Sequence, residues 1–181
     1  NDTGATEIYT LCLNAALPIY DSYLKEADHS SVFLWHSRFL QAIESFDRPR
    51  KWLLKDPCHI GRLSEILAIY PDASFIQIHR DPVETIASIC SLTEKTRRPF
   101  AKEVDKNEIG QKTLSHWQES LAKGEKDKSF ISKDKFINVK FDDFIEDPIG
   151  GIKKIYSGLN LNLNKETEEK MVNFAKIGRA S

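Results

Sequence analysis

The stretch Ser74-Phe75-Ile76-Gln77-Ile78-His79-Arg80-Asp81-Pro82 decides the fold class of this 181-residue chain. Its first six residues form a short run rich in β-branched and aromatic side chains, which predicts a strand. Asp81 is placed to cap a helix, and Pro82 suits the first helical position, where its missing N–H is not needed. A strand that leads directly into a helix is the repeating unit of parallel α/β sheets.

The same unit is predicted twice more along the chain. Apolar runs at residues 52–55 and 136–141 predict strands, and helical periodicity follows each of them. We expect further helices, in two segments between residues 6 and 46, from Pro82 to about residue 96, around residues 109–121, and over residues 165–177. The lysine-rich segment 123–135 is expected to be a solvated loop. The sequence therefore predicts one α/β domain, residues 1–181, with three neighbouring parallel strands flanked by helices.

Charge and composition narrow the classes of function. The 26 Lys and Arg residues nearly balance the 27 Asp and Glu residues, so no overall field recruits nucleic acid or an anionic membrane. No run of about 18 apolar residues is present, so no membrane span is expected. The three cysteines are widely spaced and odd in number, which disfavours a disulfide framework and a zinc site and favours a reducing, cytoplasmic compartment. Any anion-binding site must be local.

Arg80 is the strongest candidate for such a site. It lies beside a helix N-terminus, which favours anions, and its planar guanidinium can bind a phosphate with two hydrogen bonds. Ser88 follows about two helical turns later and can reach a large anion along the helix. The alternative is that Asp81 only caps the helix, Arg80 pairs with a carboxylate and Ser88 is an ordinary helix residue. Ligands of parallel sheets bind beyond the carboxyl ends of the strands, where the prediction places residues 55–59, 80–88 and 141–143.

Three segments, in this order and spacing, resemble the sulfotransferases that use 3′-phosphoadenosine 5′-phosphosulfate (PAPS). They are Trp52-Leu53-Leu54-Lys55-Asp56-Pro57-Cys58-His59, then Ile78-His79-Arg80-Asp81-Pro82 with Ser88 eight residues after the arginine, and then Val139-Lys140-Phe141-Asp142-Asp143-Phe144-Ile145-Glu146-Asp147-Pro148. The resemblance implies a P-loop NTPase-like fold, PAPS as the donor and adenosine 3′,5′-bisphosphate (PAP) as the product. It implies that Arg80 and Ser88 hold the 3′-phosphate. Phe141 occupies the place of an aromatic residue near the adenine, and burial as simple core packing is the alternative.

His59 matches the catalytic histidine of that family, about 21 residues before Arg80. An imidazole with a pKa of about 6.5 can accept a proton from an acceptor hydroxyl at neutral pH. The alternative is a loop histidine hydrogen-bonded to the backbone. Lys55 is a second catalytic candidate, because it can stabilise negative charge on the transferred group or instead pair with Asp56. His79 alternates with Arg80 along the strand, so we expect it to face the other side of the sheet and pack in the core.

The chain departs from the family at the loop that grips the 5′-phosphosulfate. That loop is rich in glycine and lies upstream, whereas Gly4 is the only glycine before Gly61. The family's C-terminal segment, which closes over the nucleotide, is also not recognisable beyond Ile177. The sequence therefore suggests a domain truncated at its N-terminus and at its C-terminus, or a diverged chain that does not hold the whole donor. Three functions stay open. The first is a sulfotransferase that needs no metal and acts on a hydroxyl or amine of a small molecule, carbohydrate or peptide. The second is a nucleotide-binding module or pseudoenzyme, and the third is a phosphoryl-transfer enzyme, which would also need a glycine-rich loop.

Overall fold

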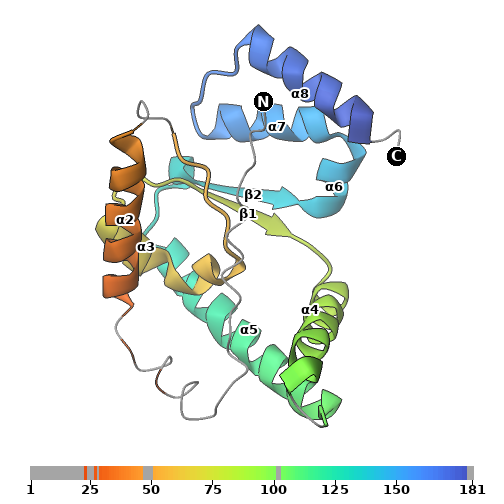
Figure 1. Ribbon diagram of the computed structural model, residues 1–181. Coiled ribbons are helices and arrows are strands. Elements are labelled where there is room, and N and C mark those ends of the chain that lie inside the picture. The colour runs from red at the N-terminus through yellow and green to blue at the C-terminus, as the bar shows by residue number, and fades with distance from the viewer. Residues whose placement is uncertain (1–22, 24–26, 28, 47–50, 101–102, 179–181) are drawn as a thin grey trace. The chain divides into compact units, whose positions relative to one another are not determined.

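The computed structural model describes residues 29–46, 51–100 and 103–178, together with Tyr23 and Ala27. Helices make up most of the described chain, and two short strands lie among them, as Figure 1 shows. None of the described helices has both the length and the apolar composition that a membrane crossing requires. In chain order the elements are α2 (Ser30–Glu44), η1 (Pro57–Arg62), α3 (Leu63–Ile69), β1 (Phe75–His79), α4 (Pro82–Arg97), η2 (Arg98–Phe100), α5 (Lys106–Lys128), η3 (Lys133–Lys135), β2 (Phe136–Lys140), α6 (Phe141–Glu146), α7 (Pro148–Gly158) and α8 (Lys165–Gly178), where η marks a 3₁₀ helix.

These elements form two compact units, each drawn from two stretches of the chain. The first unit contains the described residues up to Pro71 together with Ile89–Asp127. The second contains Asp72–Ser88 and the described residues from Lys128 onward. The backbone passes between the units three times, and one passage lies inside the continuous helix α4.

The second unit contains a two-stranded parallel sheet. β1 pairs with β2 in a register that sets Phe75 opposite Phe136 and His79 opposite Lys140. The predicted strands at these positions are therefore confirmed, as is their parallel arrangement. Because both strands run in the same direction and in this register, the residues that follow them, Arg80 and Phe141, leave the sheet at the same end.

Helices α6 to α8 complete the second unit, and α7 lies between the sheet and α8 (Figure 1). The Asp147 side chain caps the start of α7, as the Asp-Pro pair predicts. Gly158 at the end of α7 lies so close to the sheet that an added Cβ would stand 2.6 Å from Ile137 Cδ1. Lys153 of α7 forms an ion pair with Glu168 of α8 at 2.6 Å. These contacts hold α7 against β2 and α8 against α7.

The first unit contains α2, η1, α3, the second part of α4 from Ile89, η2 and α5 up to Asp127. α2 packs along α3, and this part of the unit buries Leu40, Leu63 and Ile66. α5 lies close to η1 at Gly124, where an added Cβ would lie 2.5 Å from the backbone oxygen of Ile60. The absence of a side chain at this glycine allows the two backbones to come together.

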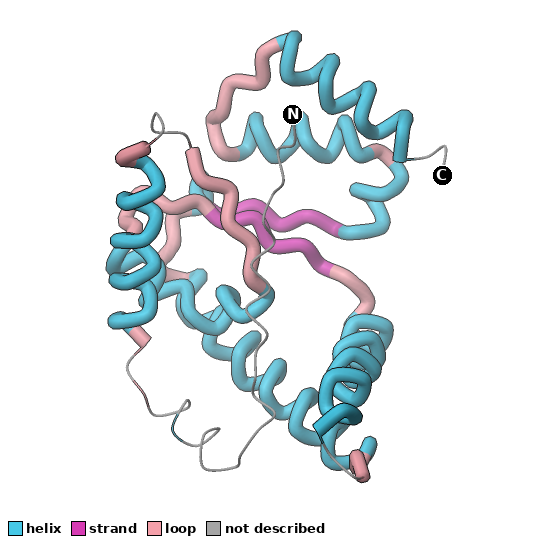
Figure 2. The backbone as a smooth tube through the Cα atoms, viewed as in Figure 1, coloured by secondary structure: helices cyan, strands magenta, loops and turns pink. Residues whose placement is uncertain are grey.

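The predicted strand at residues 52–55 is wrong, because residues 51–56 have no regular secondary structure and appear as loop in Figure 2. A strand is stable only where a neighbour supplies partners for its N–H and C=O groups. Within the described residues, only β1 and β2 pair with each other. Trp52 instead donates from Nε1 to Glu44 Oε1 at 2.5 Å, and Leu53 is exposed.

The predicted solvated loop at residues 123–135 is also wrong over its first half, because α5 continues to Lys128. Lysine and glutamate are good helix formers, so a polar segment need not be a loop. Lys123 also has a structural role, since its Nζ donates to the backbone oxygen of Gly61 at 2.7 Å and to Glu65 Oε1 at 2.7 Å. The lysine thus fastens α5 to η1 and α3.

Candidate anion and catalytic sites

The helix that follows β1 begins as the sequence predicts. Asp81 Oδ1 accepts hydrogen bonds from the backbone N–H groups of Val83 at 2.8 Å and Glu84 at 3.0 Å. The backbone oxygen of Asp81 accepts from the N–H of Thr85 at 3.0 Å, and Pro82 has no N–H. Every N–H of the first turn is therefore occupied or absent, so the helix end offers an anion its dipole but no free donor. Direct hydrogen bonds to an anion here must come from side chains.

Arg80 supplies a side chain suited to that purpose. Its guanidinium carbon lies over the Phe141 ring, 4.3 Å from the ring centroid, so the two groups form a cation–π contact. Within the described part of the chain, Arg80 forms no ion pair with a carboxylate, and its side chain is exposed. The alternative in which Arg80 serves only as a partner for an acid is therefore not observed among these residues.

Phe141 is placed by the end of β2. The strand was predicted to include this residue, but β2 ends at Lys140 and Phe141 is the first residue of α6. Its ring is half-buried and lies against the Arg80 guanidinium. The sequence could not reveal this contact, because it depends on the register in which β1 and β2 pair.

Ser88 lies on α4, seven residues after the capping aspartate and so on the same side of the helix. It is exposed, and its hydroxyl has no hydrogen-bond partner within the described residues. Seven residues correspond to about 10 Å of helix. The hydroxyl is therefore available to a ligand, but only to one that extends along the first two turns of α4.

His59 lies in the first unit, on η1. Its backbone N–H donates to the backbone oxygen of Asp56 at 3.2 Å, and the centroid of its half-buried ring is 6.3 Å from that of Phe33 on α2. Burial lowers the pKa of His59 below its ordinary value, Asp56 raises the pKa in opposition, and His36 lowers it further. His59 is consequently neutral at pH 7 and able to accept a proton.

His36 is a residue whose relation to His59 the sequence did not suggest. It lies on α2, and its Nδ1 is 2.7 Å from the hydroxyl oxygen of Tyr70, which follows α3. Burial lowers the pKa of His36 as well. His36 lies near His59 because α2 packs against the segment 57–69. Helical periodicity in the sequence cannot predict this packing.

The surroundings of Lys55 and His79 differ from those that the sequence predicts. Lys55 is exposed at the end of the irregular segment 51–56. His79 is not a core residue, as predicted, but is exposed, with its Nε2 2.8 Å from Asn138 Oδ1 on β2. Alternation along the strand therefore did not predict the exposure of His79, whose neighbour on β2 is polar. Among the described residues, Cys90 is a free thiol.

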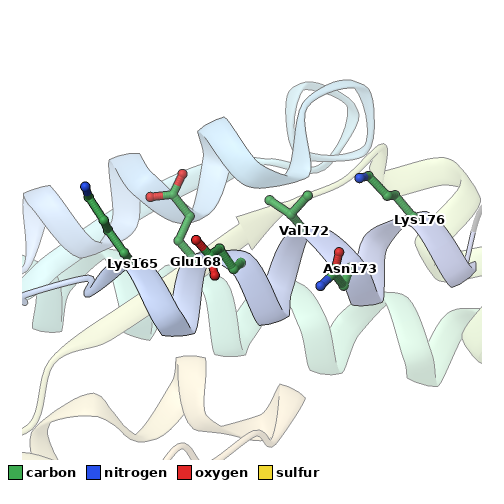
Figure 3. Close-up of a pocket in the computed structure, with 6 residues that line it drawn as sticks. Lys165, Glu168, Val172, Asn173 and Lys176 are labelled. Atoms are coloured by element: carbon green, nitrogen blue, oxygen red, sulfur yellow. The ribbon is translucent and has the colours of Figure 1, made fainter.

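No metal centre is evident among the described residues, which contain no group of three or more His, Cys, Asp or Glu side chains arranged to hold an ion. The hollow in Figure 3 does not enclose a site either. One helix, α8, provides all its lining residues, which carry charges of both signs and include none of the candidates above: Lys165, Glu168, Glu169, Val172, Asn173 and Lys176.

Comparison with known proteins places these residues in context. The model of the sulfotransferase family matches residues 14–165. Omega-hydroxy-beta-dihydromenaquinone-9 sulfotransferase Stf3 from Mycobacterium bovis and its counterpart from Mycobacterium tuberculosis are each 26% identical over 150 residues, which cover 80% of this chain and 38% of theirs. The crystal structure of sulfotransferase STF9 from Mycobacterium avium superposes with a TM-score of 0.80 and 28% identity over 86% of this chain and 40% of its own. For STF1 from Mycobacterium tuberculosis H37Rv the TM-score is 0.79 and the identity 33%, over 86% of this chain and 42% of its own. The chain thus spans about two fifths of the length of these relatives.

Proposed function

The chain belongs to the sulfotransferase family, and from that premise we propose that it carries the part of an active site that binds the 3′-phosphate of PAPS. The reaction is the transfer of a sulfuryl group from this donor to a hydroxyl or amine acceptor, with PAP as the second product. Because the chain covers about two fifths of its relatives, the activity is that of the whole protein.

The observation that carries this proposal is the state of Arg80. An arginine that leaves a parallel strand, has no carboxylate partner within the described residues and stands beside a capped helix N-terminus is a strong anion binder. A phosphate can accept two hydrogen bonds from the guanidinium. Ser88 adds a hydroxyl further along α4, and Phe141, which the resemblance sets near the adenine, has its ring against the Arg80 guanidinium.

His59 is the general base in this proposal. The acceptor oxygen or nitrogen bonds to sulfur as its proton passes to His59, and the bond between sulfur and the oxygen of the 5′-phosphate breaks. PAP leaves with the electron pair of that bond. The lowered pKa of His59 keeps its imidazole neutral and ready for this proton. Lys55 stabilises the negative charge that develops on the departing oxygen, which requires a positioned cation but no metal ion.

The class of acceptor is proposed from the reaction and from the relatives, because no side chain described above specifies it. The Stf3 relatives are named for a substrate that carries a hydroxyl group on a menaquinone derivative. We extend this only to the class, a small molecule with a hydroxyl, and keep carbohydrate and peptide hydroxyls and amines as further acceptors to be screened. We do not extend the acceptor class to nucleic acid or to a membrane surface, because a chain with a net charge of −1 has no overall field that attracts polyanions.

The experiment that tests the proposal compares two nucleotides on the intact protein. Loss of a charge-assisted hydrogen bond costs about 1.5–3 kcal/mol, so Arg80→Ala should weaken binding of PAP by roughly 10- to 100-fold in calorimetry. Binding of adenosine 5′-phosphate, which lacks the 3′-phosphate, should hardly change. Arg98→Ala is the matched control, because Arg98 is also on the surface but pairs with Glu94 at 2.6 Å. Equal losses for both nucleotides would remove the 3′-phosphate assignment.

A further inference from the structure

We propose that Phe141 is a positioning residue, whose ring holds the Arg80 guanidinium in the orientation that receives the 3′-phosphate. The inference rests on the proposed function of Arg80 and adds a role for the aromatic residue that is separate from contact with adenine. It is carried by the cation–π contact of the two groups, with the guanidinium carbon 4.3 Å from the ring centroid.

The geometry explains why a ring is suited to this task. An exposed arginine without an ion pair samples many rotamers, and fixing one of them on ligand binding costs side-chain entropy. The contact with the ring restricts the orientation of the guanidinium before the ligand arrives. A cation–π contact does not need the N–H donors of the guanidinium as hydrogen-bond partners, so they stay free for phosphate oxygens. A carboxylate partner would occupy those same donors.

The fold keeps the two groups together. Arg80 follows His79 and Phe141 follows Lys140, and these two preceding residues are register partners in adjacent parallel strands. The Arg80 and Phe141 side chains therefore start from neighbouring strand ends, and the half-buried Phe141 is anchored in the first turn of α6. A ring on a helix fixed to the sheet is a firmer support than a ring on a loop.

Ligand dependence separates this role from stacking on the adenine. PAP and adenosine 5′-phosphate share the adenine, so a ring that served only the base would affect both nucleotides equally. A ring that acts through Arg80 affects only the ligand with a 3′-phosphate. The test is therefore the ratio of the two dissociation constants, a quantity that a general loss of folded protein does not change.

The experiment is a double-mutant cycle on the intact protein, read by calorimetry. We expect Phe141→Leu to weaken the binding of PAP by roughly 3- to 10-fold. The affinity for adenosine 5′-phosphate should stay within about twofold of the parent. In the Arg80→Ala background, Phe141→Leu should cause no further loss of PAP affinity. Phe141→Tyr, which keeps the ring face, should restore the parent ratio. Phe144→Leu, on the same helix but packed against Gly151, is the matched control and should leave the ratio unchanged.

Each contrary outcome has a distinct meaning. Equal weakening of both nucleotides by Phe141→Leu would overturn the positioning role in favour of adenine stacking. Tighter PAP binding would overturn it by showing that the ring competes with the phosphate for Arg80. If Arg80→Ala is selective and Phe141→Leu is not, the positioning role alone fails. If Arg80→Ala is itself unselective, the proposed function of Arg80 fails. Should Phe141→Leu unfold the protein, Phe141→Met, which also lacks a ring, takes its place with the same expectations.

Discussion

At the scale of single residues, we assign proton transfer to His59 and binding of the 3′-phosphate to Arg80, so variants of the two should affect different quantities. If His59 takes the proton of the acceptor, His59→Ala should lower the rate of the chemical step by about 10²- to 10⁴-fold. Its nucleotide affinity should stay almost unchanged, because a proton acceptor acts on the transition state and not on the bound phosphate. Single-turnover kinetics of the intact protein measures the first quantity and calorimetry the second. Activity within about threefold of the parent would show that another group accepts the proton.

The acidic limb of the pH profile is a second test of His59. A base must be unprotonated, so the rate falls as the pH drops through the pKa of His59. Burial lowers this pKa, Asp56 opposes the shift, and His36 lowers the pKa further, so the limb should lie below the ordinary pKa of about 6.5. His36→Gln removes the positive charge that His36 gains as the pH falls, which should raise the pKa of His59 and move the limb to higher pH.

The control for that shift is Tyr70→Phe. It removes the hydroxyl that lies 2.7 Å from His36 Nδ1 but leaves the charge of His36 in place. The limb should therefore stay where it is in this variant. A limb that does not move in His36→Gln, or moves to lower pH, would contradict the electrostatic link between the two histidines.

At the scale of secondary-structure elements, the packing of α5 on η1 depends on a buried glycine. Gly124→Ala would place a Cβ 2.5 Å from the backbone oxygen of Ile60, which cannot move without shifting η1. We expect a loss of about 1–3 kcal/mol in the free energy of unfolding, measured by denaturant titration. Gly110→Ala in the same helix is the matched control, because no atom lies within 4 Å of its added Cβ. It should stabilise the protein by about 0.5–1 kcal/mol, and an equal loss in both variants would refute the close packing.

Elements with local signals were predictable from the sequence. The Asp-Pro pairs fixed the starts of α4 and α7, because a capping carboxylate and a proline act within a few residues of each other. The structure of residues 52–55 was not predictable in this way. A strand needs a partner from elsewhere in the chain, and an apolar run alone cannot specify one. His79 was misjudged for a related reason, because its surroundings depend on the polar side chains of β2.

At the scale of the whole molecule, the candidate residues fall into the two compact units. Arg80, Ser88 and Phe141 belong to one unit, whereas Lys55 and His59 belong to the other. The sequence predicts a single domain over residues 1–181, and this stays a prediction. The family membership and the contact of Arg80 with Phe141 stand independently of it, because the first rests on residues 14–165 and the second lies within one unit.

The crystal structure of the intact protein with bound PAP tests the central claim most directly. We predict that oxygens of the 3′-phosphate lie within hydrogen-bond distance of the Arg80 guanidinium and the Ser88 hydroxyl, with the guanidinium still over the Phe141 ring. A complex in which other residues bind the 3′-phosphate, while the Arg80 side chain points into solvent, would contradict the account.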